Sequence, residues 1–139
     1  MSLTFENFDA KKSKKKKIGK VDFDTIVCPA HDWGIQDVFL KEKRWYAVTM
    51  QKKNINKIKF LALYEIRWKS IRYVAKIKRI EPFENTRKFQ IIIEGEPIKI
   101  KSIRRSKNYP HLAPQNKVYT KFEYFKNATF LEDIFLRRD

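Results

Sequence analysis

The sequence predicts an α+β domain: a mostly antiparallel, bent sheet or small pseudobarrel, with a short helix after the first strand and two short C-terminal helices. Three observations favour this class. Apolar and polar residues alternate in several short runs separated by turn residues, as in successive hairpins. An early apolar run gives way to helical spacing and then to a second strand pattern. Beyond residue 120, aromatic and aliphatic residues recur as they do in amphipathic helices.

Residues 24–50 are the stretch around which we expect the domain to be organised. An apolar strand, Thr25–Cys28, stops at Pro29, and a helical spacing follows at Ile35, Val38 and Phe39. Trp33 lies at the start of that helix, where backbone N–H groups are free to bind a phosphate or carbonyl. Trp45 begins the next strand. This is the first place to look for a bound base.

The middle of the chain predicts two hairpins. Ile58–Ile66 is apolar on both faces, as in a central strand, and Trp68 lies in the bend that follows. Ile71–Ile80 has one apolar and one basic face. In the second hairpin, Lys88–Glu94 is a strand and Gly95-Glu96-Pro97 is the turn to the strand that begins at Ile98.

The remainder predicts a loop and two helices. Arg104–Lys117 has no periodicity and two prolines, so it is a long basic loop, and long loops on a sheet scaffold are commonly functional. Thr120 with Glu123, and Thr129 with Glu132, match the capping-box pattern at helix N-termini.

Length and composition indicate one intracellular domain. The chain has 139 residues, of which 21–139 form the expected domain; residues 1–20 contain seven lysines and predict a basic disordered arm or linker. A single cysteine, Cys28, excludes an intrachain disulfide and suits a reducing compartment, where it is expected to be a small buried strand residue. No run of membrane-spanning length and no signal peptide is present, so we expect a cytoplasmic or other intracellular protein without a membrane partner.

The net charge of +16 is unevenly distributed. Lys43–Ile80 contains twelve basic residues and one acid, and Pro97–Phe122 contains seven basic residues and no acid. Such segregation favours a polyanionic partner, although solvated basic faces of a lysine-rich protein are the simpler alternative.

The residues give little support to catalysis. The acids are not clustered with a lysine as in a metal-dependent nuclease, and three glycines form no phosphate-binding loop. Cys28 and His31 lack a third residue to orient them, and Glu94-Gly95-Glu96 is more simply a turn than a cation site. We therefore expect no enzyme, no metal and no cofactor, with any catalysis supplied by a partner protein or a fused domain.

A family resemblance covers Asp24 to the C-terminus. It rests on IVCPAHDWGIQDVFL, RWYAV, IKFLALYEI, IRYVAKIKRIEPF and VYTKFEYFKNATFLEDIF. In their order and aromatic positions these segments resemble the PUA-like superfamily, and most of all the EVE-like domains found beside restriction and other defence enzymes. The resemblance implies a pseudobarrel that binds nucleic acid. In the EVE and YTH branches, an aromatic pocket near the first helix and central strands holds a flipped-out, often methylated base.

Carried onto this chain, the resemblance gives candidates for a base pocket, and the grouping of basic residues on one strand face and along the loop gives a second set. The base-pocket candidates are Trp33, Trp45, Tyr64, Trp68, Tyr73 and, as a loop lid, Tyr109. For each ring the alternative is an ordinary core position. The candidates for binding the nucleic-acid backbone are Arg72, Lys76, Lys78, Lys99, Lys101, Arg104, Arg105 and Lys107.

The expected function is recognition of a flipped, modified or unmodified base as the specificity module of a defence or restriction system. Two alternatives remain. One is an RNA-binding PUA-like domain without modification sensing. The other is a basic scaffold protein that binds an acidic protein partner.

Overall fold

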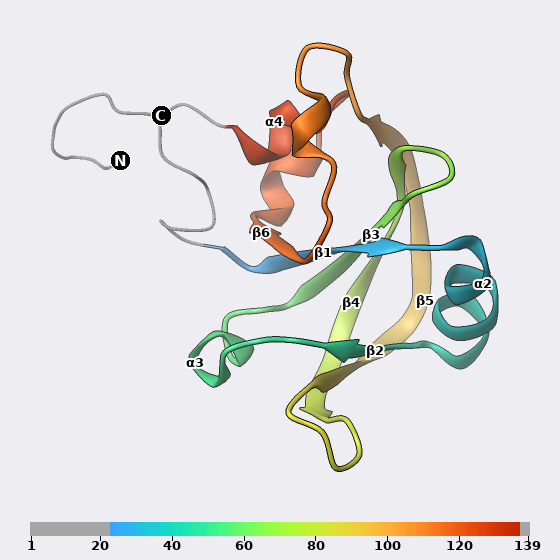
Figure 1. Ribbon diagram of the computed structural model, residues 1–139, viewed down its shortest axis with the longest axis vertical. Coiled ribbons are helices and arrows are strands. Elements are labelled where there is room, and N and C mark those ends of the chain that lie inside the picture. Colours follow the sequence, from blue (N-terminus) through green and yellow to red (C-terminus); the bar gives the residue numbers. More distant parts are fainter. Residues whose placement is uncertain (1–22, 137–139) are drawn as a thin grey trace, which may run out of the picture.

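The structure of the protein is a computed structural model, which describes residues 23–136 (Figure 1). The elements are β1 (Thr25–Ala30), α2 (Asp32–Gly34), η1 (Ile35–Leu40), β2 (Arg44–Val48), α3 (Lys52–Ile55), β3 (Phe60–Glu65), β4 (Ser70–Pro82), β5 (Phe89–Arg104), η2 (Pro110–Leu112), β6 (Val118–Thr120), η3 (Phe122–Phe125) and α4 (Glu132–Phe135). The predicted basic arm, residues 1–20, lies outside the described residues.

The six strands form one sheet in the order β2-β5-β4-β3-β1-β6. β1 pairs with β3 in parallel, and every other neighbouring pair is antiparallel. The parallel pair arises because the chain passes through α2, η1, β2 and α3 before it returns as β3. The predicted α+β class, the mostly antiparallel sheet and the helix after the first strand are therefore confirmed. The sheet is not closed, and its edges are β2 and β6.

β5 is one continuous strand of 16 residues, so the hairpin predicted at Gly95-Glu96-Pro97 is wrong. Lys76 pairs with Glu94, whereas Val74 pairs with Ile98, which leaves two additional residues on β5 as a bulge. Gly95 has a φ of 74° there. A glycine with positive φ serves a bulge as well as a turn, and the sequence alone does not distinguish the two. Further register shifts along the same ladder accompany the bend of β4 and β5 seen in Figure 1.

The interior strand β3 has buried side chains on both faces, as predicted. Leu61 and Leu63 belong to a core cluster that also contains Phe39 of η1. Ala62 and Tyr64 belong to a second cluster, which the C-terminal segment completes. Two cores on opposite faces therefore hold β3, and the first also packs the end of β1, at Ala30, with η1.

The C-terminal segment forms the 3₁₀ turn η3 and the one-turn helix α4, without either predicted capping box. The Thr120 hydroxyl donates its hydrogen bond to the Ile134 carbonyl, because pairing with β1 draws Thr120 into the core. The Asp133 carboxylate accepts hydrogen bonds from the N–H groups of Thr129 and Phe130, both at 2.9 Å. Tertiary contacts thus replace the local motif that the sequence suggested.

Candidate functional site

The chain that follows β1 brings Trp33 and Trp45 to the same place. α2 leaves Trp33 at the surface with 66% of its area exposed. The next residue, Gly34, is buried against the Trp45 ring, and a Cβ atom there would lie 3.0 Å from Trp45 Cη2. Glycine is therefore what permits this close approach of α2 and β2. The chain continues as η1, a π-helix, which is a rare helical form often found at functional sites.

An open pocket of about 110 Å³ lies between α2, η1 and β2. It is lined by Pro29, Ala30, His31, Trp33, Gly34, Val38, Trp45 and Tyr46. None of these side chains is a carboxylate, and three are large aromatic rings. The pocket is smaller than the roughly 300–1,000 Å³ of drug-sized ligand sites and approaches the ~150 Å³ of an apolar cavity that holds benzene. Because the pocket is open and smaller than that cavity, it can take one edge of a flat ring, with the rest of the ring outside.

Tyr46 and His31 line this pocket although neither was a predicted pocket residue. Regular alternation would place Tyr46 on the opposite face of β2 from Trp45. The strand is irregular, however: Ala47 has a φ of 63°, and the pairing with β5 shifts register between Tyr46 and Val48. The run Arg-Trp-Tyr at an edge strand is the sequence signal that points to Tyr46.

The Tyr46 ring is held in place from two sides. It stacks on Phe83 with 5.0 Å between ring centroids and 15° between the ring planes. The Arg44 guanidinium lies 4.6 Å from the Tyr46 centroid, and Arg44 also forms an ion pair of 2.7 Å with Glu42. This wall of the pocket is therefore preorganised, whereas the Trp33 wall is exposed.

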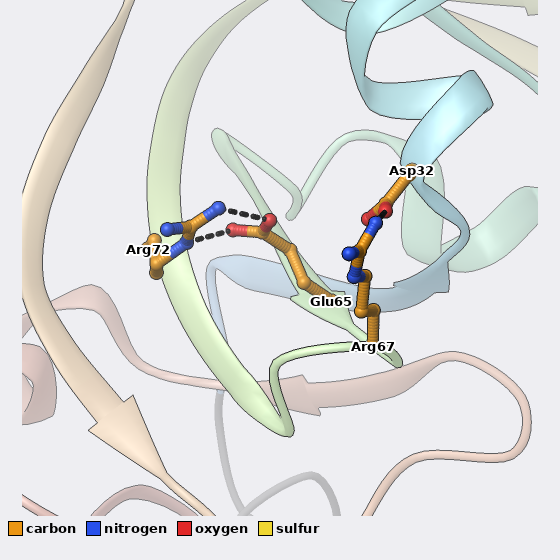
Figure 2. Close-up of polar contacts among 4 residues, drawn as sticks. All are labelled: Asp32, Glu65, Arg67 and Arg72. Atoms are coloured by element: carbon orange, nitrogen blue, oxygen red, sulfur yellow. Dashed lines mark hydrogen bonds and ion pairs between the residues drawn. The ribbon is translucent and has the colours of Figure 1, made fainter.

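Trp68 lies on the β3–β4 turn and is 52% exposed. The guanidinium carbons of Arg67 and Arg72 lie 5.1 and 5.3 Å from its ring, within cation–π range. Arg67 also bridges to Asp32 at 2.8 Å, as Figure 2 shows, and this ion pair joins the turn to the helix that carries Trp33. Trp68 is therefore tied to the same end of the sheet but does not line the pocket.

Arg72 is not free to serve as a predicted phosphate contact. Its guanidinium donates two hydrogen bonds of 2.8 Å to the two oxygens of Glu65 (Figure 2). Glu65 has a side-chain exposure of only 2%, and these hydrogen bonds raise the pKa of Arg72. Because a buried carboxylate without a partner is costly, Arg72 is held by Glu65.

The three predicted tyrosines lie elsewhere. Tyr64 is 3% exposed in the second core cluster, and burial raises the pKa of its hydroxyl. Tyr73 packs edge-on against Phe39, with 6.2 Å between centroids, beside the first core cluster. Tyr109 is half-buried in the long loop, 6.0 Å from the His111 ring. None of the three lines the pocket, so of the predicted pocket residues the structure brings together Trp33 and Trp45.

The other predicted backbone-binding residues spread along β4, β5 and the loop that follows. Lys76 is exposed and lies 3.8 Å from Glu94, and Arg104 lies 5.5 Å from the Phe130 ring. Arg105 is half-buried. The exposed remainder are Lys78, Lys99, Lys101 and Lys107. None of the predicted set lines the aromatic pocket.

Cys28 is a buried strand residue, as predicted. Burial raises the pKa of its thiol to about 12, more than the nearby Lys117 lowers it, so the thiol is protonated and inert at neutral pH. Within residues 23–136, no cluster of three or more His, Cys, Asp or Glu side chains is arranged to hold a metal ion.

The chain matches none of the protein-family models, curated proteins or solved structures with which it was compared. Over residues 23–136, no helix is both long enough and apolar enough to cross a membrane.

Proposed function

We propose that this protein is a PUA-like module that binds nucleic acid and holds one unstacked base in the aromatic pocket beside α2. In this role it would act as the recognition domain of a defence or restriction enzyme, with catalysis in a partner. The mixed sheet, the helix after β1 and the position of the pocket at that helix support the proposal.

The observation that carries the proposal is Trp33, a 66% exposed indole that forms one wall of a pocket whose other rings are Trp45 and Tyr46. Exposing so large an apolar side chain has no benefit for folding. A base flipped out of its stack loses a few kcal/mol, and stacking on an aromatic side chain returns about 1 to 3 kcal/mol.

Electrostatics also favour this partner. The net charge of +16 attracts a polyanion at long range, and no carboxylate among the pocket's lining residues would repel it. An exposed methyl group on the base would add apolar contact with the same rings.

Fluorescence anisotropy with labelled single strands, and with duplexes that carry one unpaired base, tests the proposal. Trp33→Ala should weaken binding by about 1 to 3 kcal/mol, which is roughly 5-fold to 150-fold, and Trp33→Phe should retain most of the affinity. Trp68→Ala is the matched control, because Trp68 is also a largely exposed tryptophan, at 52% against 66% for Trp33, and lies outside the pocket.

Equal losses in Trp33→Ala and Trp68→Ala would contradict a pocket-bound base. Comparison of methylated with unmodified oligonucleotides then separates modification sensing from the RNA-binding alternative. If no oligonucleotide binds, the scaffold alternative is favoured.

A further inference from the structure

A second, larger groove lies where the sheet fails to close. It has a volume of about 850 Å³, within the roughly 300–1,000 Å³ of established ligand sites. Its lining comes from the edge strand β6 and from segments near both edges of the sheet: Phe23, Thr49, Met50, Gln51, Lys53, Asn54, Lys57, Arg87, Lys117 and Tyr119. They lie before β1, between β2 and α3, in and just after α3, in the β4–β5 turn, and in β6 and the loop before it (Figure 1).

The groove is positively charged and contains no compensating acid. Four of its lining residues are basic, namely Lys53, Lys57, Arg87 and Lys117, and none is acidic. Within the described part of the chain, none of these four side chains forms an ion pair. The Lys117 ammonium instead donates a hydrogen bond of 3.2 Å to the Thr49 hydroxyl, which links the two sides of the opening.

The four cations of the groove differ from the arginines near the aromatic pocket, which are all in ion pairs. Arg44, Arg67 and Arg72 each have a carboxylate partner within 2.8 Å. A cation that already has such a partner gains less from a phosphate, whereas an unpaired lysine exchanges only water and counterions for it. The four cations of the groove are therefore available to a phosphate, as are other exposed lysines without a carboxylate partner among residues 23–136, such as Lys99 and Lys101, but those lie outside the groove.

Part of the groove wall is aromatic. Phe23 and Tyr119 stack with 4.5 Å between centroids and 20° between planes, and the Lys57 ammonium lies 5.3 Å from the Phe23 centroid. The Tyr119 hydroxyl is buried and, among the described residues, has no hydrogen-bond partner of ordinary geometry. Burial raises the pKa of this hydroxyl, and the neighbouring Asn54 side chain lowers it by less. Basic grooves with aromatic walls are the usual means of holding a nucleic-acid strand.

We infer that this groove binds the phosphodiester backbone of a nucleic-acid strand at Lys53, Lys57, Arg87 and Lys117. The inference rests on the proposed function, since it assigns the backbone site of the same ligand. The backbone site is therefore not at the residues that the sequence suggested. Its cations lie in α3, in the turn after α3, in the β4–β5 turn and in the loop before β6. None of these four was a predicted candidate.

A salt titration of oligonucleotide affinity tests the inference. The groove variant is Lys57→Gln with Arg87→Gln, and the control is Lys99→Gln with Lys101→Gln, which removes the same charge from exposed positions on β5. All four side chains are exposed, so the melting temperatures should match that of the wild type. For single strands, each lost phosphate contact lowers the slope of log K against log salt by about 0.7, so the groove variant should lose about 1.4 and the control much less.

The outcomes separate the two proposals. Equal slopes in the two double variants overturn the groove but leave the aromatic pocket intact if Trp33→Ala still weakens binding. A reduced slope in the groove variant with no effect of Trp33→Ala supports the groove and contradicts the pocket. Failure of the wild type to bind any oligonucleotide overturns both. Competition by poly-glutamate as effective as that by an oligonucleotide would also overturn the assignment to a phosphodiester.

Discussion

Gly34 lies so close to the Trp45 ring that a Cβ atom at residue 34 would be 3.0 Å from Cη2 and 3.2 Å from Cζ3. The backbone of α2 thus forms the surface against which the ring rests. Because Trp45 also lines the pocket, this contact sets how far the ring extends into it.

Gly34→Ala is predicted to change binding more than folding. Gly34 has helical dihedral angles, so alanine gains about 1 kcal/mol of helix propensity, which offsets much of the cost of crowding. The Trp45 ring has open space to move into, and that movement narrows the pocket. We expect a melting temperature near that of the wild type and an oligonucleotide affinity at least about tenfold weaker, a loss of ~1.4 kcal/mol. Unchanged affinity would show that the ring position is not set by residue 34.

Gly95→Ala, in contrast, should change folding stability and not binding. No atom lies within 4 Å of a Cβ at this position, but the φ of 74° is strained for alanine. We expect chemical denaturation to show a stability loss of about 1 to 2 kcal/mol, with oligonucleotide affinity unchanged. Gly95→Asn should recover part of the loss, because asparagine tolerates positive φ. Equal stability of all three proteins would argue against the bulge geometry of β5.

Removal of one partner of the Glu65–Arg72 ion pair is predicted to reduce the stability of the fold. Arg72→Ala leaves a carboxylate of 2% exposure without its partner, and we expect a loss of about 2 to 4 kcal/mol, less than for a fully buried pair because Arg72 is 29% exposed. Replacement of both residues by leucine should cost less than Arg72→Ala alone. Denaturant unfolding of the three variants checks this, and a double variant that is less stable than Arg72→Ala would contradict it.

The burial of Cys28 predicts that the folded protein loses stability at alkaline pH. The folded thiol has its pKa raised by burial to about 12, against 9.0 for the ordinary group, so the folded state holds this proton more tightly than the unfolded state. The contribution is complete below pH 9.0 and declines as the pH rises from there toward about 12. In that window Cys28→Ala should lose less stability with pH than the wild type does. Parallel pH profiles for the two proteins would contradict the shift.

The sequence predicted the parts of the fold that depend on side-chain periodicity. Apolar residues on both faces of β3 identified an interior strand, and the spacing after Pro29 identified the helix between Trp33 and Trp45. It did not predict the bulge at Gly95, because a turn and a bulge can use the same glycine conformation. It predicted two short helical segments after Thr120 but not how they begin, because neither capping box forms and the Thr120 hydroxyl donates to the carbonyl of Ile134 instead.

The two sites differ in how far the sequence could reveal them. The aromatic pocket arises mainly from one continuous stretch, so both Trp33 and Trp45 were selected from local patterns. The groove is assembled from segments between Phe23 and Tyr119 that meet only through the curvature of the sheet. Arg87, for example, lies in the hairpin turn between β4 and β5. Nothing in the sequence around it indicates that it lines a groove with Lys53, Lys57 and Lys117.

Photo-crosslinking to an oligonucleotide with one photoreactive unpaired base, followed by mass spectrometry, tests the central claim most directly. The account predicts that the base crosslinks to Trp33, Trp45 or Tyr46 and that Trp33→Ala reduces this yield while Trp68→Ala does not. Crosslinks concentrated at Trp68 or along β5, with none in the pocket, would contradict it.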